Sequence, residues 1–117
     1  MSQDPQQLND RIRDIQTSIE NAYSDLGNLT IEQFQSDGKT QRAVIESLIV
    51  IGEAANQVMR LAPVIQTKDP NLWSNLRNAY DMRIILTHHY FRIDTEIVWT
   101  TVKESLPLLA QALTVRS

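Results

Sequence analysis

The spacing of apolar residues constrains this chain more than any other feature of its sequence. They recur every three or four positions along most of the 117 residues, and no segment alternates convincingly at period two. Spacings of three and four place residues on one face of an α-helix, so the sequence predicts an all-α fold. In the first predicted helix the apolar stripe comprises Leu8, Ile12, Ile15, Ile19, Ala22 and Leu26.

Capping signals mark where the first half of the chain starts and stops being helical. Asp4 and Pro5 are a cap followed by a proline in the first helical position, and Gly27 is the expected end of that helix. Thr30 and Gln33 have the spacing of a capping box and predict a short helical turn. A second long helix is predicted from about residue 40 to residue 61, followed by a loop over residues 62–71.

The second half repeats the pattern. Asp69 and Pro70 predict the start of a third long helix, which ends between residues 88 and 91. Asp94 caps the last helix, which Pro107 is expected to kink. The predicted core positions of the last three helices are Ile45, Leu48, Ile49, Ile51, Ala55, Val58 and Met59, then Leu72, Trp73, Leu76, Ala79, Tyr80, Met82, Ile85 and Leu86, then Ile97, Val98, Thr101, Val102, Leu106, Leu109 and Leu113.

These elements predict a single domain over residues 1–117, an antiparallel bundle of four main helices plus one short helical turn. Gly52 falls in the middle of the second long helix. A glycine there costs about 1 kcal/mol relative to alanine, unless close packing against another helix offsets it.

Composition excludes several kinds of function. The chain has no cysteine, which rules out thiol nucleophiles and thiolate metal sites and fits a cytoplasmic protein. The polar N-terminal residues lack the apolar segment of a signal peptide, and the longest apolar run, which contains Glu46, is too short to span a membrane. The net charge of −3 argues against general electrostatic binding of nucleic acid.

Positive charge is nevertheless concentrated locally. Residues 77–92 hold three arginines and the only two histidines of the chain against one acidic residue, and these basic side chains are Arg77, Arg83, His88, His89 and Arg92. A basic cleft on an acidic protein is therefore compatible with the sequence.

Arg83 and His88 are the strongest candidates for chemistry. Arginine matches a phosphate with its planar fork, and histidine moves protons near neutral pH. Together they suit metal-independent cleavage of a phosphodiester. Five residues apart, they are separated by about 140° on a regular helix, so a shared cleft requires an irregular helix end or a second protomer. The more common alternative is structural: Arg83 pairs with Asp81 or Glu53, and His88 caps the helix.

Two neighbouring side chains are open to more than one interpretation. Adjacent histidines point about 100° apart on a helix and lack the spacing of a metal site, so no metal is expected. Tyr90 is either a packed tyrosine at a helix end or a tyrosine held beside the cleft.

The pattern Arg83-x4-His88-x-Tyr90 resembles the HepT toxins of the HEPN superfamily, whose motif is R-x4-H-x-Y. The segment "QRAVIESLIVIGEAANQV" is similar to the second-helix signature of that family, and "LWSNLRNAYDMR" and "YFRIDTEIVWTTVKESLPLL" resemble the segments that flank its motif. The resemblance covers most of residues 8–113.

The resemblance implies an all-helical homodimer in which two motifs face one cleft. It implies the toxin of a bacterial type VII HEPN/MNT toxin–antitoxin system, which cleaves messenger or transfer RNA with Arg83 and His88 and requires no cofactor. The implied partner is a nucleotidyltransferase antitoxin of the MNT type, which transfers AMP to Tyr90. The remaining candidates for RNA binding or for support of the site are His89, Arg77, Arg92, Arg42 and Glu53.

Ile84 departs from the family pattern, which usually has a polar residue directly after the arginine. If that polar group orients the histidine or the RNA, this chain has weaker or differently selective activity. The alternative function is therefore a non-catalytic helical dimer that binds the nucleotidyltransferase, or RNA or nucleotide. A purely structural helical bundle would leave the motif unexplained.

Overall fold

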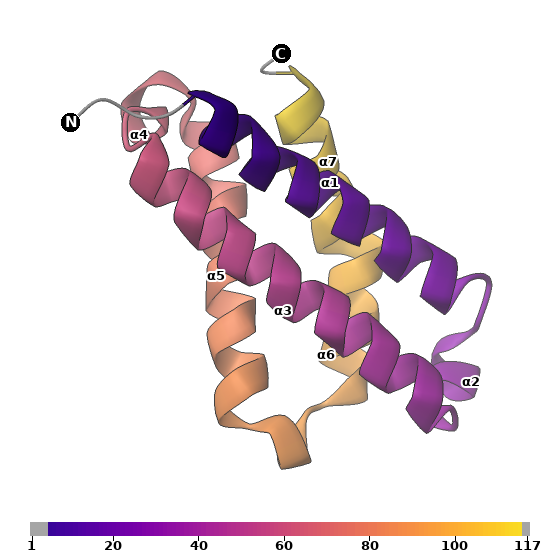
Figure 1. The fold of residues 1–117 in the computed structure, drawn as a ribbon. Helices are drawn as coiled ribbons and strands as arrows, with labels where there is room; N and C mark the ends of the chain where they lie inside the picture. The colour runs from indigo at the N-terminus through magenta and orange to yellow at the C-terminus, as the bar shows by residue number, and fades with distance from the viewer. Residues whose placement is uncertain (1–4, 116–117) are drawn as a thin grey trace.

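The computed structural model describes residues 5–115, and within them the fold is all-α, as predicted. Asp4, which was predicted to cap the first helix, lies outside the described residues. The helices, in chain order (Figure 1), are α1 (Pro5–Leu26), α2 (Ile31–Gln35), α3 (Gly38–Leu61), α4 (Ile65–Lys68), α5 (Pro70–His88), the 3₁₀ helix η1 (Tyr90–Arg92), α6 (Thr95–Thr100), the π-helix η2 (Thr101–Ser105) and α7 (Leu106–Val115).

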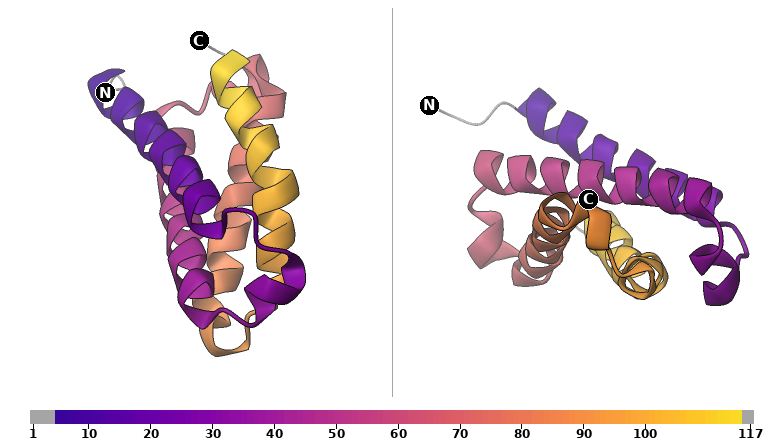
Figure 2. Two further views of the ribbon diagram at one scale, coloured as in Figure 1. Left: turned by 90° about the vertical axis from the view of Figure 1, so that its right-hand side faces the viewer. Right: turned by 90° about the horizontal axis from the view of Figure 1, so that it is seen from below.

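The four main helices are arranged in two layers. Helices α1 and α3 run antiparallel in one layer, and α5 and the continuous run α6–η2–α7 form the other (Figures 1 and 2). Helix α3 contacts both α1 and α5, so it is the central helix of the bundle. This arrangement confirms the predicted antiparallel bundle of four main helices.

Most of the predicted helix ends are confirmed by their capping contacts. The side chain of Thr30 accepts from the backbone N–H of Gln33, whose own side chain accepts from the backbone of Thr30. Asp69 and Asp94 accept from backbone N–H groups in the first turns of α5 and α6. Gly27 has a φ of 57°, which a glycine adopts at little cost at the end of a helix.

Three details differ from the predictions. Helix α3 begins two residues early, at Gly38, because the Asp37 carboxylate caps it by accepting from the backbone N–H of Thr40, which also lowers the pKa of Asp37. The segment predicted as a loop contains the short helix α4. The irregular turn of the last helix lies before Pro107, in η2, where the N–H of Leu106 donates to the carbonyl of Thr101.

The position of η2 follows from the chemistry of proline. Pro107 has no N–H, and its ring would press against the carbonyl four residues earlier, that of Lys103. A wider π turn moves that carbonyl away, so the chain continues into α7 without breaking the helix.

The core forms where the four helices meet. Its buried apolar residues include most of the predicted positions, together with Phe34 and Val44. The prediction is wrong for Ile85 and Ile97, whose exposed fractions are 48% and 47%. Helical periodicity identifies an apolar face, but within residues 5–115 no other helix covers these two side chains. Within residues 5–115, no helix is both long and apolar enough to cross a membrane.

Candidate functional site

Arg83 lies on the face of α5 that packs against the core. It continues the stripe of Leu72, Leu76 and Ala79 and precedes Leu86, and these five positions fall within about 80° of the helix circumference. Three of them, Leu72, Leu76 and Leu86, are fully buried, whereas the side chain of Arg83 is 31% exposed. The helix therefore anchors the base of the arginine in the packed interface and lets its guanidinium reach outward.

Gly52 makes this placement of Arg83 possible. A Cβ atom at residue 52 would overlap the Cβ of Arg83 and would lie 2.7 Å from the carbonyl oxygen of Ala79. Helices α3 and α5 thus cross at a point where only a glycine fits. The close packing offsets the low helix propensity of Gly52, and it holds the backbone of Arg83 against α3.

Glu53, the next residue of α3, holds the guanidinium. Its Oε1 lies 3.1 Å from Nε of Arg83, although the N–H is not aligned for a hydrogen bond and this nitrogen is buried without one. Of the two acidic partners predicted for Arg83, the structure therefore selects Glu53. Asp81 instead pairs with Arg77, at 3.4 Å.

The Arg83–Glu53 pair lines an open groove of about 500 Å³ between α1, α3 and α5. Gln57 donates to Glu53 and accepts from Arg11, so the polar contacts continue across the groove. Sequence reasoning missed Arg11 and Gln57 because they belong to different helices and share no motif.

His88 is the last residue of α5, and its side chain is exposed. Within residues 5–115 it makes no hydrogen bond or ion pair, and it does not line the Arg83 groove. The helix stays regular up to His88, and the N–H of His89 still donates to the carbonyl of Ile85. The irregular helix end that would bring Arg83 and His88 together is therefore not observed, and the two side chains remain about 140° apart.

His88 belongs instead to the opposite face of α5. Arg77, Asp81, Ile84 and His88 fall within about 60° of the circumference and form one stripe along the helix. Ile84 is half-buried and the other three are exposed. The residue that departs from the family pattern is thus a neighbour of His88 rather than of the Arg83 guanidinium.

Tyr90 lies in η1, directly after α5, and is 47% exposed. Its ring packs edge-on against Phe91, with 5.3 Å between the centroids, and Phe91 is 95% exposed. Tyr90 is thus an exposed residue of the turn after α5, and it does not line the Arg83 groove. His89 and Arg92 border a mainly apolar pocket of about 210 Å³ beside this turn.

The remaining candidates do not gather at one point. Arg42 is exposed and lies eleven residues before Glu53 on α3, roughly 16 Å along the helix, outside the Arg83 groove. In the part of the chain that the structure describes, no group of three or more histidine, aspartate or glutamate side chains could hold a metal ion.

An exposed apolar surface surrounds the end of α5. It consists of Ile85, Phe91 and Ile97, which are between 47% and 95% exposed. These residues come from α5, η1 and α6, so the surface exists only in the folded chain.

Comparison with known proteins gives consistent matches along the chain. Residues 9–115 match the family model described as ribonuclease HepT-like. A protein of Thermococcus cleftensis described as a probable ribonuclease HepT is 38% identical over 104 residues, which cover 86% of each chain. A candidate RNase of Methanocaldococcus jannaschii is 37% identical over 95 residues, which cover 80% of this chain and 74% of that protein.

A solved structure shares the fold. It is described as the crystal structure of a toxin–antitoxin with AMP-PNP, and one of its chains matches with a TM-score of 0.72 and 24% identity, over 94% of this chain and 96% of that one. At this identity the match supports the helical fold. Because the family model covers nearly the whole sequence, and the relatives match at 37% and 38% identity, this chain belongs to the HepT-like ribonuclease family.

Proposed function

We propose that this protein is the toxin of a HEPN/MNT toxin–antitoxin system and a metal-independent endoribonuclease. The observation that carries the proposal is the arrangement of α5 in a member of this family. Arg83 is fixed at the crossing with Gly52 and paired with Glu53, while His88 stands free at the exposed end of the same helix.

The two side chains supply complementary chemistry. His88 removes the proton from a ribose 2′-hydroxyl, or donates a proton to the leaving oxygen. Arg83 binds the phosphate and stabilises the charge that develops on the phosphorane-like transition state. Neither step needs a metal ion.

The separation of Arg83 and His88 around α5 supports a site made by two protomers. In a symmetric dimer, a phosphate can contact Arg83 of one protomer and His88 of the other. The apolar surface of Ile85, Phe91 and Ile97 adjoins His88, and exposed apolar patches of this kind are typical of protein interfaces. We therefore infer that a homodimer forms through this surface.

A mixing experiment tests the composite site. Arg83→Ala and His88→Ala proteins are each expected to be inactive on RNA in a buffer with EDTA. After subunit exchange in an equal mixture, half of the dimers contain one protomer of each variant. Each of these mixed dimers has one intact Arg83–His88 site and one inactive site, so about a quarter of the wild-type activity should return. A mixture that stays inactive after proven exchange would contradict a shared site, and wild-type cleavage that depends on added metal would contradict the mechanism.

Tyr90 is proposed as the target of an MNT-type antitoxin. Transfer of AMP to its hydroxyl would add bulk and negative charge two residues after His88, and the attached phosphate would compete with the RNA backbone for the basic side chains. The exposure of Tyr90 in η1 supports its accessibility to an enzyme.

The Tyr90→Phe variant tests this control. Co-expressed with the cognate nucleotidyltransferase, wild-type protein is expected to gain the mass of one or more AMP groups, while the variant gains none and still cleaves RNA. Tyr80→Phe is the matched control, because Tyr80 lies on α5 and is half-buried. Full modification of Tyr90→Phe, measured by intact mass, would refute the assignment.

A non-catalytic dimer is the second candidate, and Ile84 is the observation that favours it. Its side chain occupies the His88 stripe, where the family usually has a polar group. Intact RNA after incubation with unmodified wild-type protein, together with a stable complex with the nucleotidyltransferase, would favour this function.

A further inference from the structure

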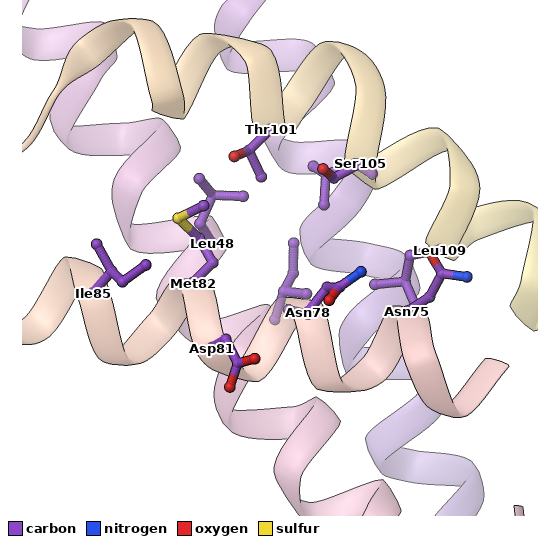
Figure 3. Close-up of a pocket in the computed structure, with 12 residues that line it drawn as sticks. Leu48, Asn75, Asn78, Asp81, Met82, Ile85, Thr101, Ser105 and Leu109 are labelled. Carbon is purple, nitrogen blue, oxygen red and sulfur yellow. The ribbon is translucent and has the colours of Figure 1, made fainter. Parts of the chain in front are cut away.

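A cavity of about 250 Å³ lies between α5 and the last helix, away from the Arg83 groove. Figure 3 shows residues of α5 on one side of it and Thr101 and Ser105 of the π-helix η2 on the other. The irregular turn that Pro107 requires therefore forms one wall of the cavity.

The walls of the cavity combine an apolar floor with a polar rim. The apolar part is supplied by Leu48, Ile51, Ala79, Met82, Ile85, Leu106 and Leu109. Ile85 also belongs to the proposed dimer surface, so a partner protomer would border the cavity without filling it. The rim consists of Asn75, Asn78, Asp81, Thr101 and Ser105.

Only part of the rim is free, because Asp81 pairs with Arg77 and the hydroxyl of Thr101 donates to the carbonyl of Ile97. Within residues 5–115, the side chains of Asn78 and Ser105 make no hydrogen bond. Asn75 donates from its Nδ2 to the carbonyl of Asn71, which leaves its Oδ1 free to accept. These groups can serve a ligand without first breaking contacts inside the protein.

The charge of the rim limits which ligands fit. No lysine, arginine or histidine lines the cavity, and Asp81 lies at its edge, so the cavity itself does not suit a phosphate. Carboxylate, amide and hydroxyl oxygens accept hydrogen bonds, so they favour the two N–H groups of an exocyclic amine over uracil, whose one N–H on the pairing edge lies between two carbonyl oxygens. The apolar floor, with the thioether of Met82, favours a flat ring.

The position of the cavity connects it to the proposed site. Asp81 pairs with Arg77, which stands outside the cavity on the stripe that ends at His88. Asn78 precedes His88 by ten residues, about 15 Å along the helix. The phosphate of a nucleotide whose ring is held in the cavity can reach Arg77, which lies eleven residues, about 16 Å, before His88 on the same stripe.

We infer that this cavity, lined by Asn75, Asn78, Met82 and Ser105, is a subsite for one amino-bearing nucleobase of the RNA strand. The inference rests on the proposed ribonuclease function and adds to it a selectivity for adenine, guanine or cytosine over uracil. Sequence-selective proteins commonly recognise unstacked single-stranded bases by stacking and by hydrogen bonds to their edges. The isolated base moiety fits the volume, and the backbone stays outside.

Binding of free nucleosides tests the subsite without any cleavage. Of the methionines within residues 5–115, Met82 lines the cavity and Met59 is buried outside it. With ¹³C-labelled methionine methyl groups, adenosine, guanosine or cytidine is expected to shift the NMR signal of Met82 and leave that of Met59 in place. Uridine is expected to bind more weakly.

Two matched asparagines locate the binding. Asn78 and Asn71 are both exposed on α5, but only Asn78 lines the cavity, and alanine keeps either position helical. Asn78→Ala should weaken nucleoside binding about five-fold, the effect of one hydrogen bond, and Asn71→Ala should not. On RNA, Asn78→Ala should raise KM and leave kcat unchanged.

The outcomes separate this inference from the proposed function. A Met82 signal that does not respond to any nucleoside, equal binding of uridine, or an unchanged affinity of Asn78→Ala would each overturn the subsite, even if the protein cleaves RNA. A selective Met82 response that Asn78→Ala weakens would support it, even in a protein that leaves RNA intact.

Discussion

His88→Ala is expected to lower RNA cleavage by about 10²- to 10⁴-fold, the usual contribution of a general acid or base. The side chain is exposed and makes no contact that the fold requires, so the melting temperature should stay the same. Initial rates on a single-stranded RNA in EDTA, together with a thermal melt, measure both effects. Expression of the variant should also no longer arrest growth.

His89→Ala is the matched control for this variant. It changes the adjacent histidine, which is also exposed and borders the apolar pocket beside η1 rather than the His88 stripe. Its cleavage rate should stay within a few-fold of the wild-type rate, because His88, the proposed general acid or base, is still present. Full cleavage and full toxicity of His88→Ala would show that this histidine does not perform the chemistry.

Gly52→Ala is expected to lower both stability and activity. The added Cβ would collide with the Cβ of Arg83 and the backbone of Ala79, so α5 has to move away from α3. Overpacking of this kind lowers the free energy of unfolding by about 1–3 kcal/mol. The higher helix propensity of alanine offsets about 1 kcal/mol of this loss. The shift also moves Arg83 relative to Glu53, so RNA cleavage should fall in protein that is still folded.

Gly38→Ala separates the crowding from the effect of losing a glycine. Its Cβ would meet only Nη1 of Arg42, at 3.3 Å, and this flexible side-chain end can move. Denaturant unfolding should therefore show Gly38→Ala as stable as wild type or slightly more stable. A Gly52→Ala protein with unchanged stability and cleavage would mean that the close crossing does not position Arg83.

The bundle was predictable because its signals are local. Apolar spacing and the capping residues Thr30, Asp69 and Asp94 act within one or two helical turns, and their contacts are confirmed. Helix α4 was missed because it is only four residues long and lies in a segment rich in turn signals. The π-helix was missed because Pro107 shows that a helix must change, but not how the carbonyl before it moves.

The candidate site was predictable only in part. The motif identified Arg83, His88 and Tyr90, and the pairing of Arg83 with Glu53 was one of two predicted alternatives. The separation of Arg83 and His88 by about 140° on a regular helix was predicted. The exposure of Ile85 and Ile97 and the contributions of Arg11 and Gln57 were not predicted. These features depend on which helix covers which face, and helical periodicity does not identify that partner.

The sequence by itself determined the helical fold, most helix ends and the residue types that can act on a phosphodiester. The tertiary structure decided where those residues lie. It brings α5 against Gly52 so that Arg83 is fixed beside Glu53, and it leaves His88 free on the other side of the helix. The physical reason is that propensity, capping and periodicity act between neighbours along the chain, whereas contacts between helices depend on their packing in space.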